Sequence, residues 1–217
     1  MRKDSLFLVI ILIVGFLAGN QKLVVVENEY NTSLIQLQEN QALADFIPDD
    51  PLTIVGNTEL ASAALAESWL GNGTASNPFI IEGYSFFNDT ITMSPTYHLS
   101  ISNTSYYLKI RNCSFVWGRP FNYVRGITLD NVTNTIITNC SFTHLETGIR
   151  IQNSSRCTVR NITCMNIRVN GIYFLDCQDI LVEDNTIVGG EYGISFNYAL
   201  DFSTIRNNTL INSSIFL

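Results

Sequence analysis

The sequence predicts an all-β fold, a parallel β-helix in which each coil contains three short strands, preceded by a short N-terminal helical cap. One observation is a glycine-isoleucine phrase that returns every 22 or 23 residues. A period of this length marks a solenoid, because a single repeat cannot bury its own apolar face and must stack on its neighbours. The second observation is the alternation of apolar and polar residues around each phrase, which is typical of strands with one buried face. The copies begin at Gly126, Gly148, Gly171 and Gly193.

Each coil is expected to contain three strands joined by turns rich in Asn, Ser, Thr and Gly. The first strand follows the glycine and points isoleucines inward, while Thr128, Arg150, Tyr173 and Ser195 point outward in successive coils. The second strand has an alternation of its own, as in Thr135/Ile137 and Ile180/Val182. No sustained helical period follows Asn77, and β-branched and aromatic residues dominate. The third strand carries one inward residue per coil: Phe142, Cys164, Ile187 and Leu210.

Two further columns of residues repeat with the coils. We expect the glycine of each phrase to take a corner conformation with positive φ. A second phrase, such as Asn207-Asn-Thr-Leu, places Cys or Ile in one register position in the earlier coils and Asn in the later ones, which indicates that this position points inward. Asparagine amides stacked there would hydrogen-bond along the axis. The segment Trp117 to Val124 is read as an insertion. The shared register holds Cys113, Cys140, Ile162, Asn185 and Asn208.

The N-terminal part is expected to serve export. Residues 1–19 combine a basic start with the apolar run Leu6 to Gly19, which predicts either a signal peptide or a retained membrane anchor. Both place the rest of the chain outside the cytoplasm, as a cell-surface, membrane-anchored or secreted protein. Residues 20–50 resemble a polar stem, and residues 51–77 an N-terminal cap. Within the cap, Glu59 to Leu70 predicts an amphipathic helix with Leu60, Ala63, Ala64, Leu65 and Leu70 on one face.

Residues 78–217 are expected to form the β-helix, truncated at the C-terminus. Ile215 stands where the next glycine phrase is due, which leaves an apolar, uncapped coil. Either the sequence is a fragment, or a partner subunit caps this coil. Net charge is −7 and no basic patch is present, so no nucleic-acid partner is expected.

Cysteine and asparagine residues supply two sets of candidate modification sites. Cys113 and Cys140 share one register on adjacent coils, so they are the disulfide candidate, while small buried residues are the alternative. No Cys-x-x-Cys occurs, so no metal site is predicted. The Asn-x-Ser/Thr sequons are glycosylation candidates, although such residues also fill β-helix turns. They are Asn31, Asn72, Asn88, Asn103, Asn112, Asn131, Asn139, Asn153, Asn161, Asn207 and Asn212.

Two groups of residues are candidates for binding or catalysis. Asp176, Asp179 and Asp184 lie in one coil, and they could supply paired catalytic carboxylates or a calcium site; solvated turn carboxylates are the alternative. Calcium is the only cofactor considered. Arg150 and Tyr173 are expected to be outward neighbours on adjacent coils, where they could stack on a sugar ring, or be ordinary surface residues.

The repeats also resemble a known family. Asp184-Asn-Thr-Ile, Asn207-Asn-Thr-Leu and the four glycine-isoleucine phrases are similar to the right-handed parallel β-helix repeats of the NosD-like and carbohydrate-binding/sugar-hydrolase superfamily. Leu52-Thr-Ile-Val-Gly-Asn and Asn77-Pro-Phe-Ile-Ile-Glu-Gly-Tyr look like the first segment of archaeal surface β-helix proteins. The resemblance implies a right-handed coil. It does not imply one function, because this scaffold carries lyases, hydrolases, isomerases and non-enzymatic proteins.

We therefore predict an exported, surface-displayed β-helix protein of the cell envelope, with a structural or carbohydrate-recognition role and no identified catalytic set. Its partners would be a polysaccharide or glycan, and the membrane through the N-terminal segment. The first alternative is a polysaccharide lyase or glycoside hydrolase acting from the outer face. A stalk or adhesin domain that presents glycans is a weaker alternative. A NosD-like metal-site maturation factor is disfavoured, because His98, His144, Met93 and Met165 form no cluster in the sequence.

Overall fold

The computed structural model describes residues 24–25, 51–88, 96–118, 123–198 and 201–216. The predicted signal peptide or anchor at 1–19, the sequon at Asn31 and most of the 20–50 stem lie outside these residues. Within the described ranges, no helix is long and apolar enough to cross a membrane.

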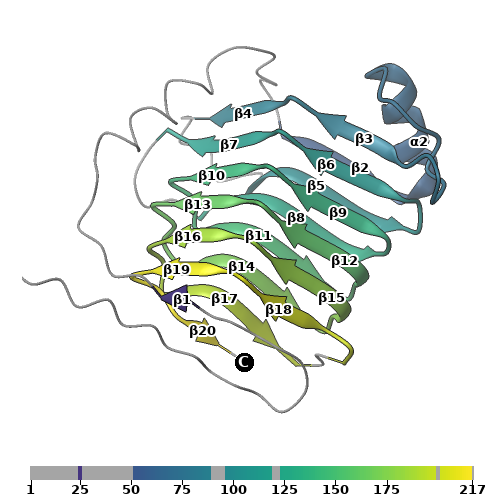
Figure 1. The fold of residues 1–217 in the computed structure, drawn as a ribbon. Helices are drawn as coiled ribbons and strands as arrows, with labels where there is room; N and C mark the ends of the chain where they lie inside the picture. The colour runs from purple at the N-terminus through teal and green to yellow at the C-terminus, as the bar shows by residue number, and fades with distance from the viewer. Residues whose placement is uncertain (1–23, 26–50, 89–95, 119–122, 199–200, 217) are drawn as a thin grey trace, which may run out of the picture.

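The chain winds into a parallel β-helix of three sheets, as predicted (Figure 1). Successive strands of one sheet belong to successive coils, and all strand pairs are parallel. Sheet A contains β4 (Ser85–Asn88), β7 (Ser114–Trp117), β10 (Ser141–Thr143), β13 (Thr163–Met165), β16 (Thr186–Val188), β19 (Thr209–Ile211) and β1 (Val24–Val25). Sheet B contains β2 (Leu52–Val55), β5 (Tyr97–Thr104), β8 (Arg125–Val132), β11 (Thr147–Gln152), β14 (Asn170–Leu175), β17 (Tyr192–Asn197) and β20 (Ile215–Phe216). Sheet C contains β3 (Phe79–Glu82), β6 (Leu108–Arg111), β9 (Thr135–Thr138), β12 (Ser155–Arg160), β15 (Gln178–Glu183) and β18 (Thr204–Arg206).

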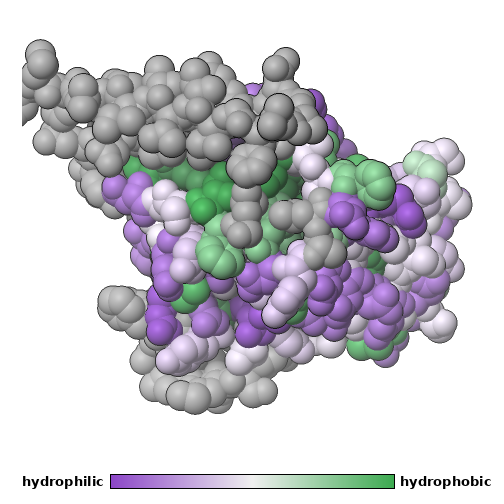
Figure 2. Space-filling view, turned by 90° about the horizontal axis from the view of Figure 1, so that it is seen from below, coloured by the Kyte–Doolittle hydropathy of each residue, from purple (hydrophilic) through white to green (hydrophobic). Residues whose placement is uncertain are grey.

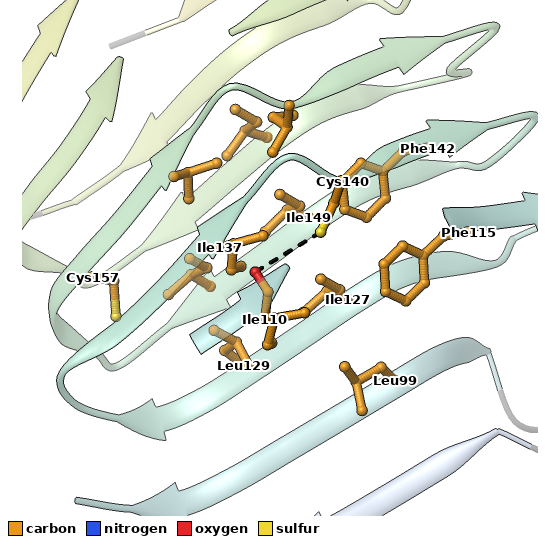
Figure 3. Packing of buried hydrophobic residues seen from close by; sticks show 14 of the residues in the cluster. Leu99, Ile110, Phe115, Ile127, Leu129, Ile137, Cys140, Phe142, Ile149 and Cys157 are labelled. Atoms are coloured by element: carbon orange, nitrogen blue, oxygen red, sulfur yellow. Dashed lines mark hydrogen bonds between the residues drawn. The ribbon is translucent and has the colours of Figure 1, made fainter. Parts of the chain in front are cut away.

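The core fills the space between the three sheets with columns of identical register (Figure 3). Phenylalanines form one column, in which the ring centroids of Phe86 and Phe115 are 4.8 Å apart and those of Phe115 and Phe142 are 4.9 Å apart. Cys164, Ile187 and Leu210 continue this column, as the predicted inward positions of the third strand require. Stacking at the strand spacing gives every apolar side chain a neighbour above and below.

The predicted outward positions of sheet B are confirmed for three of the four residues. Thr128, Arg150 and Tyr173 are half-buried on the outer face. The prediction is wrong for Ser195, which is only 2% exposed. Its hydroxyl donates to Asn170 Oδ1 at 2.7 Å, and it lies in register between the larger side chains of Tyr173 and Phe216.

The glycine prediction is also wrong in its reason. None of the four phrase glycines has a positive φ. They are required by close packing instead, because a Cβ on Gly148 would lie 2.6 Å from Gly171 O and 2.9 Å from Cys164 Sγ. A Cβ on Gly126 or Gly171 would likewise meet the next glycine carbonyl at 2.6 Å. The glycine column therefore lets adjacent coils approach each other at the junction of sheets A and B.

The positive-φ corners are occupied by other residues. Asn and Asp dominate these positions because their short polar side chains tolerate the left-handed conformation. One column follows sheet C and runs from Gly83 through Asn112, Asn139, Asn161, Asp184 and Asn207. A second follows sheet B and holds Asn103, Asn131, Asn153, Asp176 and Tyr198.

The predicted asparagine ladder is present in the last coils. Asn185 and Asn208 are each 1% exposed, and Asn185 Nδ2 donates to Asn208 Oδ1 at 2.9 Å. Asn185 Oδ1 accepts from the Ile162 backbone N–H at 3.0 Å, and its amide also donates to Val159 O. Each buried amide thus satisfies backbone groups that the turn would leave unpaired.

The N-terminal cap differs in detail from the prediction. Helix α2 spans Gly56–Ala66, so it begins and ends earlier than Glu59 to Leu70. Leu60 and Ala64 are buried as expected, but Leu65 is 83% exposed and Leu70 is 66% exposed, because Leu70 lies beyond the helix. Strand β2, within the segment expected as cap, already pairs with β5 in sheet B, and α2 packs against both strands.

Candidate functional site

Arg150 and Tyr173 are neighbours on the outer face of sheet B, as the sequence predicts. The Arg150 guanidinium lies 5.1 Å from the centroid of the Tyr173 ring. Arg150 Nε donates to Gln152 Oε1 at 2.9 Å, and Asn197 Nδ2 donates to the Tyr173 hydroxyl at 2.9 Å. One face of the ring is therefore occupied by the arginine, so this pair is held within the protein and offers a ligand less aromatic surface than predicted.

Arg125 adds a second cation to the same face. It is in register with Thr147 one coil on, beside the strand that carries Arg150. Partial burial lowers the pKa of Arg125, and the nearby Arg150 charge lowers it further, while Glu146 raises it. The pKa of an arginine starts so high that both guanidinium groups stay charged at neutral pH.

A groove at the N-terminal end of the solenoid is the more developed site. Its volume is about 550 Å³. It lies where the cap meets the first coil, between the end of α2 and strands β3 and β4. The residues that line it are Glu67, Ser68, Trp69, Leu70, Ile80, Glu82, Gly83 and Tyr84.

Two aromatic side chains form one wall of this groove. Trp69 and Tyr84 make an edge contact, with ring centroids 6.4 Å apart and an interplanar angle of 87°. Trp69 Nε1 donates to the Tyr84 hydroxyl at 2.7 Å, and that hydroxyl donates to Glu67 Oε2 at 3.1 Å. Tyr84 also stacks on the buried Phe86 at 5.8 Å. The core and the hydrogen bonds therefore fix the tyrosine ring in place.

The two carboxylates of the groove have distinct environments. Arg111 hydrogen-bonds Glu82 Oε2 at 2.6 Å, and Asn112 Nδ2 donates to Glu82 Oε1 at 2.7 Å. The hydrogen bond from Arg111 is the main cause that lowers the pKa of Glu82, so this carboxylate is ionised at neutral pH. Burial raises the pKa of Tyr84, which keeps its hydroxyl protonated. The groove thus combines aromatic surface, charged acceptors and a neutral hydroxyl.

The sequence did not point to this groove, but it contained a signal. Ser85 pairs with Ser114, so Tyr84 stands beside Cys113 in the column that later holds Cys140, Ile162 and the asparagines. In later coils this position is buried by neighbours on both sides. In the first coil the position faces the cap, so a large polar aromatic residue can reach Trp69 there.

The three candidate catalytic aspartates are corner residues. Asp176, Asp179 and Asp184 are all exposed, with φ of 51°, 54° and 57°. Asp179 and Asp184 lie at opposite ends of β15. Their backbone N–H groups bond the next coil, for example Asp184 N to Arg206 O at 3.3 Å. Their place in the corner columns accounts for their residue type.

A metal centre finds no support in the described residues. Among them, no group of three or more His, Cys, Asp or Glu side chains is placed to hold a metal ion. His98 and His144 are far apart in environment, since His98 is buried and His144 is exposed. Met93 lies outside the described residues.

The structure shows no bond between Cys113 and Cys140, contrary to the disulfide prediction. Both thiols are free and buried, as are Cys157, Cys164 and Cys177. Cys113 and Cys140 do share the predicted column, where parallel side chains give poor disulfide geometry. Each thiol donates instead to a backbone carbonyl of its own strand end, Cys113 to Arg111 O at 3.2 Å and Cys140 to Thr138 O at 3.4 Å.

Most of the sequon asparagines lie at exposed corners. The residue after each of Asn112, Asn139 and Asn161 points into the core, so the asparagine itself faces solvent as expected. Several amides are already engaged: Asn112 Nδ2 with Glu82, and Asn131 Nδ2 with Asn103 Oδ1 at 2.9 Å. The sequons at positive φ are Asn103, Asn112, Asn131, Asn139, Asn153, Asn161, Asn207 and Asn212. Asn72 is also exposed, and Asn88 ends β4. Corner geometry therefore accounts for most of the sequon density.

Comparison with known proteins supports the architecture. The family model described as the right-handed β-helix region matches residues 76–216. No curated protein matches the chain. Among solved structures, the fold is similar to that of an alginate lyase from Paenibacillus sp. str. FPU-7, with a TM-score of 0.44 and 15% sequence identity, covering 74% of this chain and 76% of that one. A likeness at this level carries no argument about activity.

Proposed function

The chain belongs to the right-handed β-helix family, and from that premise we propose that it is an exported protein of the cell envelope that recognises carbohydrate without cleaving it. The groove between the cap and the first coil carries this proposal, because Trp69, Tyr84, Glu67 and Glu82 converge there. The apolar run near the N-terminus supports export. The likeness of the repeats to NosD-like and archaeal surface proteins supports a place at the envelope.

The chemistry of the groove suits a neutral pyranose. Sugar rings present C–H faces that pack against aromatic side chains, and hydroxyls that hydrogen-bond carboxylates. Glu82 is held ionised by Arg111, so it accepts hydrogen bonds and does not donate them. A shallow groove with a few fixed polar groups gives specificity through orientation. The outer face of sheet B, with Arg125, Arg150 and Tyr173, is a second surface on which a long glycan could continue.

A glycan and polysaccharide array, with mass spectrometry of any products, tests this proposal on the full-length chain. We expect binding without cleavage. Tyr84→Phe and Glu82→Gln should each weaken binding about tenfold, since each removes one charge-assisted or hydroxyl hydrogen bond. Arg150→Gln is the matched change on the sheet B face, and it should leave the affinity for a short oligosaccharide unchanged.

Three results would contradict the proposal. Absence of binding to every glycan would remove carbohydrate recognition. Equal loss in Arg150→Gln would move the site to sheet B. Cleavage of a polymer would favour the lyase or hydrolase alternative, and Asp176→Asn, Asp179→Asn and Asp184→Asn would then test whether the corner aspartates take part.

A further inference from the structure

The last coil of the β-helix is paired with a segment from the other end of the sequence. Strand β1 lies parallel to β19, with Val24 in register with Thr209 and Val25 in register with Leu210 (Figure 1). Elsewhere in sheet A, neighbouring strands come from consecutive coils. Strand β1 thus takes the place in sheet A that a further coil would take.

The surface at this end of the solenoid is apolar. Ile205 and Ile215 are half-buried and pack against the core, while Phe202 is 89% exposed and Phe216 is 46% exposed. Seen from this end, hydrophobic surface gathers on the end face within a border of hydrophilic side chains (Figure 2). An unpaired strand edge beside apolar surface favours association with other chains, and solenoids need a cap there.

We propose that the Val24–Val25 segment is a capping strand that closes the terminal coil of its own chain. The occupant fits chemically, because Leu23-Val24-Val25-Val26 is a run of β-favouring residues without proline. Strand addition of this kind satisfies the backbone groups of an exposed edge through main-chain hydrogen bonds.

The connecting segment is long enough for closure within one chain. Twenty-five residues separate Val25 from Pro51. At full extension they could span about 80 Å. The six steps from β4 to β1 in sheet A cover roughly 29 Å at the usual strand spacing. Pairing in cis therefore needs no stretched connection, and it brings the apolar run at 6–19 to the same end as the last coil.

Thiol cross-linking of the full-length chain in mild detergent tests the register. In Val24→Cys/Thr209→Cys, we expect a short bis-maleimide to link the two positions within one chain, detected by peptide mapping. Val24→Cys/Thr186→Cys is the matched control, because Thr186 occupies the same column one coil further in. It should link at least tenfold less. The five native cysteines are buried, which limits competing reaction.

Hydrogen exchange gives a second measurement that needs no cross-link. Val25→Pro removes a strand N–H, so the β19 amides should exchange at least tenfold faster while the β4 amides stay unchanged. Gln36→Pro, elsewhere in the stem, should have no effect on β19. Equal linking in both cysteine pairs, links only between chains, or unchanged exchange in Val25→Pro would overturn the proposal. Links between chains would show that a second copy provides the strand.

Discussion

The coils after Arg125 and the coils before it solve the same packing problem differently. In the later coils one register position is always glycine, from Gly126 to Gly193, and a Cβ there would collide with the next coil. In the first coil the same position is His98, since its neighbours Tyr97 and Leu99 pair with Arg125 and Ile127. The repeating rule thus ends where the stack begins.

The residues that break the rule are those with chemical character. His98 is 3% exposed, and its ring lies 6.2 Å from those of Phe86 and Trp117, measured between centroids. Its Nε2 and the Trp117 Nε1 have no hydrogen-bond partner. Tyr84, which stands in the column of Cys113, lines the groove. The comparison teaches that the regular coils supply stability by stacking, whereas the first coils carry the polar aromatic groups that a ligand could meet.

The largest effect should come from breaking the glycine column. Gly148→Val places two methyl groups where a Cβ alone would lie 2.6 Å from Gly171 O, and we expect a loss of about 4 kcal/mol in the free energy of unfolding, near the upper end of overpacking effects. Urea unfolding measures it. Gly83→Asn is the control, because nothing lies within 4 Å of its Cβ position and asparagine fills the same corner in later coils. A small effect of Gly148→Val would show that the coils can separate locally.

A pH titration should affect the first coil through His98. Burial lowers its pKa from 6.5 to about 4. Between these values the unfolded chain binds a proton that the folded chain does not, so stability is full above pH 6.5 and is lost as the pH falls toward 4. The loss at pH 4 should be about 3 kcal/mol, since one pKa unit corresponds to about 1.4 kcal/mol.

His98→Phe should remove that part of the pH dependence, because phenylalanine suits the surrounding rings and does not titrate. His144→Gln, at an exposed corner, should leave the profile as it is. Thermal unfolding between pH 7 and pH 4 compares the three proteins. An identical profile in His98→Phe would place the acid sensitivity elsewhere.

A smaller effect is expected from the asparagine ladder of the regular coils. Asn185→Ala leaves the Ile162 N–H and the Val159 carbonyl without their side-chain partner, which should cost about 2 kcal/mol. Asn139→Gly, at an exposed corner with φ of 54°, should change stability far less. Denaturant midpoints of the two variants make the comparison. If both lose equally, the buried amides contribute no more than corner residues do.

The smallest effect should come from the outer face. Arg150→Ala removes the guanidinium above the Tyr173 ring, and an exposed cation–π contact contributes about 0.5–1 kcal/mol. Chemical denaturation at low and high salt measures it, with Thr128→Ala in the same column as control. A loss as large as that of Asn185→Ala would mean that the outer face also holds the coils together.

Much of this architecture could be predicted because a solenoid repeats its physics. The period, the inward columns and the asparagine ladder all follow from residues that recur in register, such as Ile149 and Asn185. The conformation of the glycines could not be deduced, because a close approach and a positive φ both require glycine. The groove depends on Trp69 and Tyr84 coming together from segments with no repeat between them. Strand β1 pairs with β19 from nearly the opposite end of the sequence, and no local pattern announces such a contact.

The corners between sheets A and B differ in length along the molecule. The connections from β4 to β5 and from β7 to β8 are longer than those from β10 to β11 and from β13 to β14, yet the strands on both sides keep their register. Because each coil contacts only its neighbours, extra residues at this corner need not disturb any column. An engineer could therefore graft a foreign peptide between Thr143 and Thr147 and display it beside Arg125, while the fold behind it keeps its alignment.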